Sequence, residues 1–502
     1  MKRQLITLVL ASVLVALAAP VTLAAPLPRS TPAAEGISSQ AILDMVDSLQ
    51  SLEKTWIHHL MVIRHGRVVA EVHPTPFRAS DTHTLYSASK TFTAMAIGLC
   101  VDDNRLRMDD RVAAFFPDKL PDTVSANLAT VTVRDVITMM AGAKPDWVLR
   151  NVETDWLRAL MAKPIERPTT YQYDTMCSFI LAAIVQRVSG KTALQLLNER
   201  LFGYMEITDA QWQQSPDGYN TGGWGLRVSA EDCAKLAVLI MNKGRWQGQQ
   251  LISEAWIDEM CARQVASAPA DTPLNDGSAG YGYHIWRCKY PGAVRADGAY
   301  GQYIVMVPER DVAVVLLGVS YNGHGELACI WDRLMPGVHD TPLTADHAAS
   351  RLQRALAQWS QPMPQGQRAA SHSDINRHEL LLDKNKHGLA GITVSDNTLR
   401  LRYVEGQTET LELGNNRWAY TPLAGYPLYS IHALNRFEGL THDFEAACTG
   451  AWTSSTTLQL DVCYVNWISA TRLVVDTAAG TVTITDNVEV NNPQTVTYQL
   501  AQ

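Results

Sequence analysis

Residues 88–101 constrain the fold most, because apolar side chains cover nearly the whole circumference of the helix that they predict. A helix of this kind lies inside a core, with other elements packed all around it. The chain has 502 residues, 46% of them hydrophobic, which is enough to build such a core. The apolar side chains of this helix are Phe92, Met95, Ala96, Ile97, Leu99 and Val101.

Strand and helix patterns flank this segment on both sides. Residues 37–55 have helical spacing, and the alternating runs 60–63 and 68–71 predict a hairpin that turns at His65-Gly66. The regions before and after the apolar helix therefore supply both sheet and helix. Further helices are predicted at 133–141, 176–188, 192–202 and 229–242, and strands near 281–287, 302–307 and 312–318.

The pattern changes towards the C-terminus. A helix near 345–358 runs into the polar, proline-bearing segment 360–366, which is typical of a linker. Beyond about residue 373, short alternating segments are separated by Gly, Asn and Asp, as in a small all-β domain. We therefore expect a first domain over residues 30–345, a helix and linker over 346–372, and an all-β domain over 373–502.

Residues 1–24 have the pattern of a signal peptide. Lys2 and Arg3 precede a short apolar stretch over residues 5–19, and Thr22-Leu23-Ala24 offers small residues for cleavage before Ala25. No later segment reaches eighteen consecutive apolar residues, as a membrane-spanning helix requires. An uncleaved N-terminal anchor is the alternative. We expect an exported protein, periplasmic or secreted, with no membrane span after signal removal.

Charge and cysteine content narrow the possible partners. The formal net charge of −8 and the pI near 6.0 give no basic surface for nucleic acid or an anionic membrane. The eight cysteines form no Cys-x-x-Cys pair, so a zinc knuckle or a redox motif is not indicated. Cys448 and Cys463 flank a predicted hairpin and are the expected disulfide if one forms, and buried thiols are the alternative for the other cysteines.

Ser87-Ala88-Ser89-Lys90 stands at the start of the apolar helix and predicts nucleophilic chemistry. A serine hydroxyl is scarcely ionised at neutral pH and needs a partner to attack a carbonyl. The helix N-terminus offers backbone N–H groups, and Lys90 falls one turn along the same face. Ser51-Leu52-Glu53-Lys54 fits the same Ser-x-x-Lys pattern, but no buried helix follows it. We therefore predict Ser87 as the nucleophile.

A second element leads into another apolar helix. Tyr173-Asp174-Thr175 is followed by the helix that ends in Ser189-Gly190, and this order resembles the serine β-lactamase-like and penicillin-binding-protein-like hydrolases. The resemblance is strongest to the class C β-lactamase, esterase and 6-aminohexanoate-dimer hydrolase branches. It maps the family tyrosine to Tyr173, two residues from the competing Tyr171. Thr175 replaces the family's Asn or Ser and is expected to contact substrate.

The family's Lys-Thr-Gly strand has a divergent counterpart in residues 295–302. Gly298 matches the glycine, but Ala296 and Asp297 replace the lysine and threonine. The resemblance implies an oxyanion hole made by the backbone N–H groups of Ser87 and Ala299, with Asp297, Gly298 and Tyr300 at the substrate. An acidic Asp297 would repel the carboxylate of a β-lactam. Weaker family matches, 132–142 and 222–229, extend the resemblance over residues 30–335.

The resemblance implies an α/β (α+β) fold of the β-lactamase/transpeptidase type, with a mixed antiparallel sheet flanked by helices and an all-helical subdomain at about residues 100–230. It implies a serine hydrolase that cleaves an ester or amide of a small molecule or short peptide through an acyl-enzyme on Ser87. Tyr173, its pKa lowered by Lys90, would accept the serine proton, and Lys90 is the alternative base. No metal or cofactor is expected, because the neighbouring histidines, among them His58, His59, His65 and His83, lack ligand spacing.

Two other function classes stay open. The chain could be a β-lactamase or a D,D-peptidase acting on cell-wall peptides, or a non-catalytic penicillin-binding-like receptor module. Asp297 argues against the first, and the retained Ser87, Lys90 and Tyr173 argue against the second. The sequence does not indicate an oligomeric state.

Overall fold

The computed structural model describes residues 25–142, 148–166, 170–371, 378–428, 430–487 and 493–501. The predicted signal peptide and its cleavage site therefore lie outside the described residues. None of the described helices is long and apolar enough to cross a membrane.

In the described chain, six strands form an antiparallel sheet in the order β2-β1-β11-β10-β9-β8. The predicted hairpin is present, with its turn at His65-Gly66. The strand expected near 281–287 is reduced to two residues, because His284 in the left-handed region (φ 53°) takes the chain before it out of the extended conformation. The strands are β1 (Thr55–Arg64), β2 (Arg67–Val72), β8 (Trp286–Arg287), β9 (Val294–Gly298), β10 (Gln302–Val307) and β11 (Val312–Ser320).

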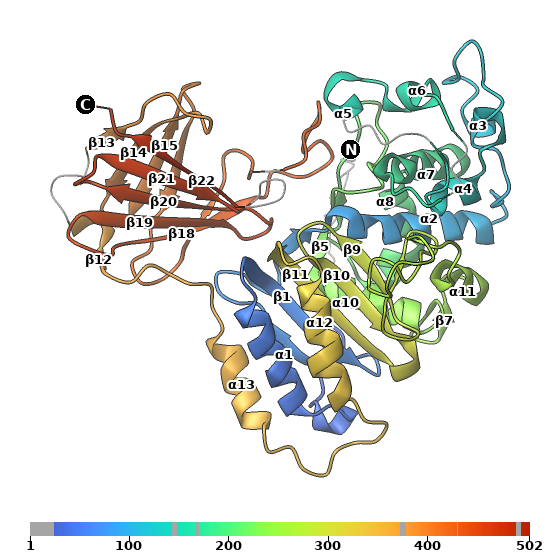
Figure 1. Ribbon diagram of the computed structural model, residues 1–502, viewed down its shortest axis with the longest axis horizontal. Helices are drawn as coiled ribbons and strands as arrows, with labels where there is room; N and C mark the ends of the chain where they lie inside the picture. Colours follow the sequence, from blue (N-terminus) through green and yellow to red (C-terminus); the bar gives the residue numbers. More distant parts are fainter. Residues whose placement is uncertain are drawn as a thin grey trace, which may run out of the picture.

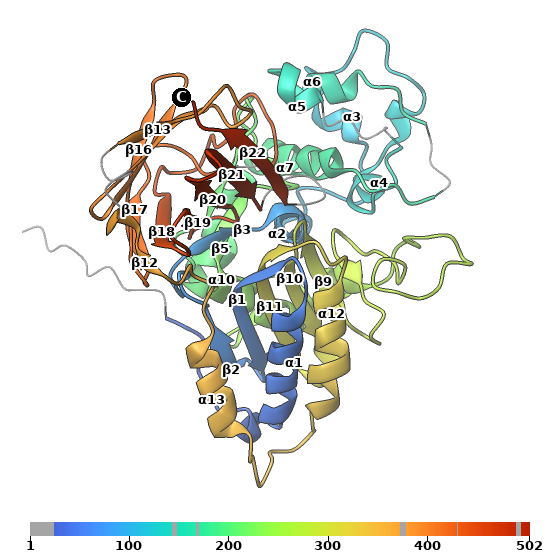
Figure 2. The same ribbon diagram turned by 60° about the vertical axis from the view of Figure 1, so that its left-hand side comes forward.

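Helices cover both faces of this sheet (Figures 1 and 2). In β11, Val314 and Leu316 pack with α1, α12 and α13, whereas Val315 and Leu317 pack into the core that contains α2 and α10. Alternate residues of a strand point to opposite faces, so one apolar strand fills both cores. The helices are α1 (Ser39–Ser51), α2 (Ser89–Asp102), α10 (Ala230–Met241), α11 (Glu254–Cys261), α12 (Gly325–Cys329) and α13 (Ala349–Gln358).

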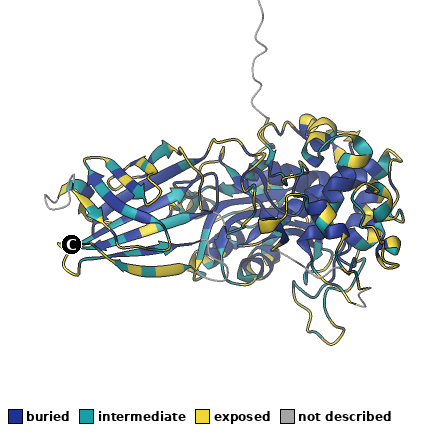
Figure 3. Ribbon diagram, turned by 90° about the horizontal axis from the view of Figure 1, so that it is seen from above, coloured by how far each residue is buried: buried dark blue, intermediate teal, exposed yellow. Residues whose placement is uncertain are grey.

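The predicted apolar helix, α2, is buried along its length from Ser89 to Cys100. Figure 3 shows the buried residues concentrated in the sheet and the helices packed on it. The hydroxyls of α2 are satisfied by backbone carbonyls of neighbouring loops: Thr91 donates to His284 and Thr93 to Gly222. The burial of α2 confirms the prediction that this apolar helix lies inside a core.

A group of helices lies beyond the far side of α2, at about the position predicted for the all-helical subdomain (Figure 1). The helix expected at 133–141 ends at Ile137, because Met139 and Gly142 are in the left-handed region (φ 62° and 83°). The one expected at 192–202 is a short α-helix continued by a π-helical turn. The elements are α3 (Val112–Phe115), α4 (Val133–Ile137), α5 (Leu149–Val152), α6 (Trp156–Met161), α7 (Thr175–Ser189), α8 (Ala193–Leu197) and α9 (Gly203–Met205).

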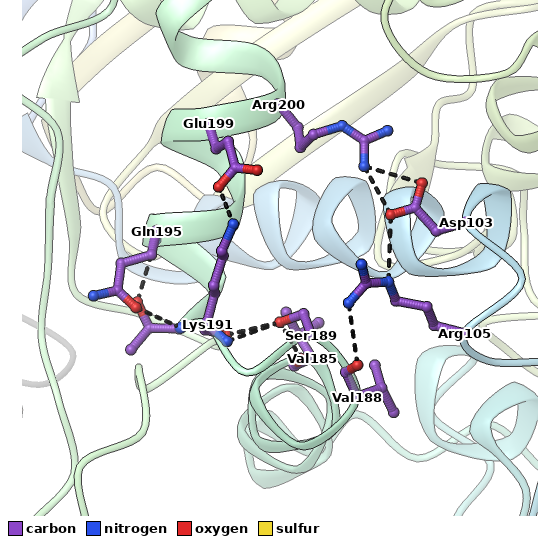
Figure 4. A network of polar contacts seen from close by, with 10 residues as sticks. Asp103, Arg105, Val185, Val188, Ser189, Lys191, Gln195, Glu199 and Arg200 are labelled. Carbon is purple, nitrogen blue, oxygen red and sulfur yellow. Dashed lines mark hydrogen bonds and ion pairs between the residues drawn. The ribbon is translucent and has the colours of Figure 1, made fainter.

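A polar network fixes the C-terminal ends of α2 and α7 (Figure 4). Asp103, directly after α2, accepts hydrogen bonds from Arg200, and Arg105 donates to the carbonyl of Val188 in α7. Thr192 caps α8, so Lys191-Thr192-Ala193 is a helix start rather than a Lys-Thr-Gly-like strand. The network holds together the two helices that carry the predicted site residues.

The C-terminal region consists of two antiparallel sheets, as the alternating pattern predicted. It adjoins the first domain on the side of α13 (Figures 1 and 2). One sheet contains β12 (Gln367–Arg368), β17 (Ala419–Pro422), β18 (Glu445–Trp452), β19 (Thr457–Tyr464), β20 (Ala470–Asp476), β21 (Thr481–Asp486) and β22 (Gln494–Gln499), and the other β13 (Glu379–Leu381), β14 (Leu389–Ser395), β15 (Thr398–Tyr403) and β16 (Thr408–Glu412).

The expected Cys448–Cys463 disulfide is wrong. All eight cysteines are unpaired in the described chain. In the β18–β19 ladder Cys448 stands opposite Val462, and Cys463 stands opposite Ala447. Because facing residues share a side of the sheet and neighbours along a strand alternate, the two sulfurs point to opposite faces.

Candidate active site

Ser87 and Lys90 lie at the junction between the sheet domain and the helical subdomain. Ser87 is in a short 3-10 turn, Tyr86–Ala88, directly before α2, and its side chain is partly exposed. Lys90 Nζ is 2.9 Å from Ser87 Oγ, because residues three apart on a helix face the same side. The predicted Ser-x-x-Lys pair is therefore in hydrogen-bond contact.

Lys90 is buried, with 2% of its surface exposed. Its amine also contacts Thr175 Oγ1 at 3.1 Å and the carbonyl of Gly223 at 2.8 Å. Burial lowers the pKa of Lys90 to about 7, against the opposing effect of the Asp174 carboxylate. A substantial fraction of the amine is therefore neutral near neutral pH and able to accept a proton.

Thr175 differs from its predicted role. Its side chain is 2% exposed and lies behind Lys90, where it contacts the amine. The buried position leaves it no surface for substrate. The N-terminus of α7 faces the first turn of α2, so the Thr175 hydroxyl contacts the Lys90 amine and helps to orient it.

Tyr173 also lies beside the nucleophile, close enough for the Ser87 hydroxyl to affect its ionisation. Its ring stacks on Trp286, with centroids 5.7 Å apart, and Lys90 Nζ lies 4.9 Å from the centre of the ring. Burial raises the pKa of Tyr173 above its ordinary value, although the nearby Ser87 hydroxyl lowers it. The expectation that Lys90 lowers the Tyr173 pKa is therefore wrong, because desolvation by burial outweighs the lowering effects of Ser87 and Arg295.

The turn after β9 lies directly against the turn that carries Ser87. A Cβ on Gly298 would stand 2.2 Å from the carbonyl oxygen of Leu85 and 3.1 Å from the nitrogen of Ala88. A glycine is therefore required for this approach. Ala299, the next residue, is exposed, and the part of its backbone N–H in an oxyanion hole stays a prediction.

Tyr300 and Gln302 shape that same turn. Tyr300 adopts a left-handed conformation (φ 64°), and its ring meets Tyr86 edge-on with centroids 5.2 Å apart. The Gln302 amide donates to the carbonyls of Ala299 and Tyr300 at 3.1 and 3.2 Å, and to Gly318 at 2.7 Å. Gln302 thereby ties the turn to β11, a role that the sequence pattern did not indicate.

Asp297 is not an isolated negative charge. Arg295 holds it in an ion pair of 2.8 Å, and His324 Nε2 lies 3.4 Å away. Burial opposes ionisation of Asp297, yet Arg295 and His324 outweigh it and hold the pKa of the carboxyl below its usual value. The ionised carboxylate is thus compensated by the buried guanidinium, which weakens the repulsion of anionic substrates expected from the sequence.

In the part of the chain that the structure describes, none of the competing sequence matches makes a hydrogen bond with Ser87 or Lys90. Ser51 is at the exposed end of α1, where its hydroxyl donates to Ser48. Tyr171 packs on Tyr281, and its buried hydroxyl has no hydrogen-bond partner in the described chain. His58 and His83 are buried and bonded to each other at 3.0 Å. Among the described residues, no group of three His, Cys, Asp or Glu side chains is placed to hold a metal ion.

Two contributions to the site escaped sequence reasoning. The Gly223 carbonyl is the third partner of Lys90, and a Cβ on Gly223 would stand 2.4 Å from Thr175 Cγ2. The glycine-rich run at 222–225 was the sequence feature that could have indicated this close backbone approach to Lys90. His284 Nδ1 donates to the Ile137 carbonyl and Nε2 accepts from the Ser178 hydroxyl, at 2.8 Å each, which braces the helix behind Lys90. A single histidine in a loop gives no such signal.

This fold, a helix-flanked antiparallel sheet with the serine and lysine at the start of a buried helix, defines a class of serine hydrolases. A family model described as Beta-lactamase matches residues 58–327, more than half of the chain. The chain belongs to the Beta-lactamase family.

The chain is similar to other proteins over part of its length. The 6-aminohexanoate-dimer hydrolase of Paenarthrobacter ureafaciens is 24% identical over 312 residues, which cover 57% of this chain and 79% of that protein. A solved structure from Bacillus anthracis, assigned as a 6-aminohexanoate-dimer hydrolase, has a TM-score of 0.51 at 16% identity and covers 62% of this chain and 87% of its own. A penicillin-binding protein homologue from Caulobacter crescentus has a TM-score of 0.46 at 18% identity, with 56% and 91% covered. The chain is thus a hydrolase of the Beta-lactamase family that is similar to a 6-aminohexanoate-dimer hydrolase.

Proposed function

We propose that the protein hydrolyses an ester or amide of a small, largely uncharged substrate through an acyl-enzyme on Ser87. The contact of 2.9 Å between Ser87 Oγ and the buried amine of Lys90 carries this proposal. Nucleophilic catalysis by serine requires a base whose pKa lies near the working pH and which is in hydrogen-bond contact with the hydroxyl. The named relative, which hydrolyses a 6-aminohexanoate dimer, supports an amide or ester of a flexible chain as substrate.

The pKa order assigns the proton transfers. The pKa of Lys90 is lowered to about 7 and that of Tyr173 is raised, so the amine loses its proton first. Neutral Lys90 accepts the Ser87 proton as Oγ attacks the carbonyl carbon, and the carbonyl oxygen becomes an oxyanion at the N–H groups of Ser87 and Ala299. Tyr173 donates its proton to the leaving group and recovers one from the Lys90 ammonium. Water then cleaves the acyl-enzyme by the reverse transfers.

Intact-mass analysis tests this proposal. The protein is exposed to p-nitrophenyl esters, a linear 6-aminohexanoate dimer, a chromogenic cephalosporin and short D-amino-acid peptides. We expect an acyl adduct that maps to Ser87 and is absent in Ser87→Ala. Ser51→Ala is the matched control, because Ser51 belongs to the second Ser-x-x-Lys sequence and should leave acylation unchanged. Acylation that persists in Ser87→Ala would exclude this mechanism, and rapid cephalosporin turnover would favour the β-lactamase alternative.

We also propose that the protein is exported and loses residues 1–24. The charged start, the short apolar stretch and the small residues at Thr22 and Ala24 support this. N-terminal sequencing of the protein from cell fractions tests it: a periplasmic or secreted form starting at Ala25 is expected. Retention of Met1 in a membrane fraction would indicate the uncleaved anchor instead.

A further inference from the structure

The connection between β17 and β18 leaves the C-terminal sheets and extends across to the helical subdomain, as Figure 1 shows. Its described residues in the range 426–437, hereafter the crossing segment, contact the first domain at several places, one of them the hydrogen bond from the Asn435 amide to the Gln214 carbonyl. Ser430 Oγ is 3.0 Å from the hydroxyl of Tyr86, and the backbone N–H of Leu434 donates to the carbonyl of Arg150 in α5 at 3.0 Å.

The contacts of Ser430 and Leu434 lead to the catalytic residues. Tyr86 directly precedes Ser87 and packs against Tyr300 of the proposed oxyanion turn. The guanidinium of Arg150 lies 5.1 Å from the centre of the Trp224 ring, and Trp224 follows Gly223, whose carbonyl contacts Lys90. The crossing segment therefore joins one element beside the nucleophile to another beside its base.

The segment presents apolar side chains to solvent at this place. Leu434 is 50% exposed, and Val148 and Val152 on either side of Arg150 are 63% and 64% exposed. With Tyr426 and Leu428, these make five of the ten large hydrophobic side chains that are exposed in the described chain. A hollow of about 500 Å³ is lined by Asn151 and by residues of the segment, the apolar Tyr426, Ala433, Leu434 and Phe437 and the polar His432 and Arg436. Clustered exposed apolar groups of this kind mark binding surfaces.

We propose that the crossing segment is a specificity element that binds an apolar alkyl chain of the substrate whose carbonyl is attacked by Ser87. This inference rests on the proposed function and extends it. The segment contacts Tyr86, which precedes Ser87, and the carbonyl of Arg150, and this connection favours a substrate chain as the occupant of its apolar surface. The C-terminal domain then serves to select substrates by chain length, because each buried methylene adds affinity.

The test measures how fast Ser87 is labelled by ethyl and by octyl fluorophosphonates, followed by intact mass. We expect the natural protein to prefer the octyl reagent by about 10-fold or more, and the double variant Leu428→Ser/Leu434→Ser to lose about 10-fold of that preference, as expected for pockets that lose apolar surface. The matched control is Leu381→Ser/Val404→Ser, because these side chains are also exposed (43% and 65%) and lie in the same domain, on and beside the sheet β13–β16. The control should keep the preference.

The outcomes separate the two proposals. Equal labelling by both reagents in the natural protein, or an unchanged preference in the loop variant, would overturn the role of the crossing segment and leave the nucleophile assignment intact. Absence of labelling at Ser87 by either reagent would overturn the proposed function and this inference together. The ratio of two rates on one protein sample is insensitive to a partly unfolded fraction, so a loss of folded variant cannot imitate the expected result.

Discussion

Gly298 and Leu85 approach each other so closely that a Cβ on Gly298 would stand 2.2 Å from the Leu85 carbonyl oxygen. Leu85 belongs to the chain that enters the Ser87 turn, and Gly298 ends β9 just before Ala299. The distance between the nucleophile and the second proposed oxyanion donor is thus set by backbone packing.

Gly298→Ala should therefore push the turn that carries Ala299 away from the turn that carries Ser87. We expect kcat to fall by about 10²–10³, the usual effect of losing one oxyanion donor, and the free energy of unfolding to drop by about 1–3 kcal/mol from overpacking. Steady-state kinetics and urea unfolding measure the two effects. Gly425→Ala is the control, because a Cβ there meets no atom within 4 Å. Full activity in Gly298→Ala would contradict the proposed turn.

The pH dependence of kcat/KM should report the Lys90 amine. The pKa is lowered to about 7, and the neutral form is the active one, so kcat/KM should rise with pH through about 7 and then level off. Asp174 raises that pKa, so Asp174→Asn should move the midpoint to lower pH while the side chain still caps α7 at Met176. A profile that is flat from pH 5 to 9, or a midpoint that moves upwards in Asp174→Asn, would argue against Lys90 as the base.

Much of the fold followed from local pattern. A helix that is apolar all round must be buried, and the apolar runs that form β1, β2, β10 and β11 are typical of strands. The Ser87–Lys90 contact was also predictable, because helical geometry alone brings residues three apart together.

What the pattern could not supply depends on tertiary packing. The direction of the Tyr173 pKa shift follows from burial under Trp286, and the compensation of Asp297 follows from Arg295 two residues earlier on the same side of β9. The Cys448–Cys463 disulfide was predicted wrongly because the strand register places each cysteine one residue away from facing the other, and the spacing of residues in the sequence does not determine that register. The crossing segment contacts Tyr86 and Arg150 only because the fold brings together parts of the chain that are far apart in sequence.

Tyr173→Phe should separate proton donation from packing. The variant keeps the ring on Trp286 and beside Lys90 but removes the hydroxyl that contacts Ser87. Because nitrophenolate leaves without a proton, we expect kcat for a p-nitrophenyl ester to fall by about 10-fold or less, and for an amide or alkyl ester by about 10²–10⁴. Tyr171→Phe is the matched control and should leave both rates within about twofold. Equal losses on the two substrates would argue against Tyr173 as the proton donor.

Buried histidines should make the fold sensitive to mild acid. Burial, reinforced by nearby Lys90, lowers the pKa of His284 to about 3 from its ordinary 6.5. The unfolded chain therefore binds a proton below pH 6.5 that the folded protein binds only near pH 3, so stability is greatest above 6.5 and is lost as the pH falls through this window.

From pH 7.5 to pH 5 the contribution of His284 amounts to about 2 kcal/mol, at about 1.36 kcal/mol per pH unit below 6.5. Urea midpoints at the two pH values measure it. His284→Asn, which suits the left-handed backbone at φ 53°, should flatten the pH dependence by about that amount, whereas His347→Asn on the exposed surface should leave it unchanged. If His284→Asn kept the full acid sensitivity, the imidazole would have to be protonated in the folded protein, and the neutral brace between Ser178 and Ile137 would be excluded.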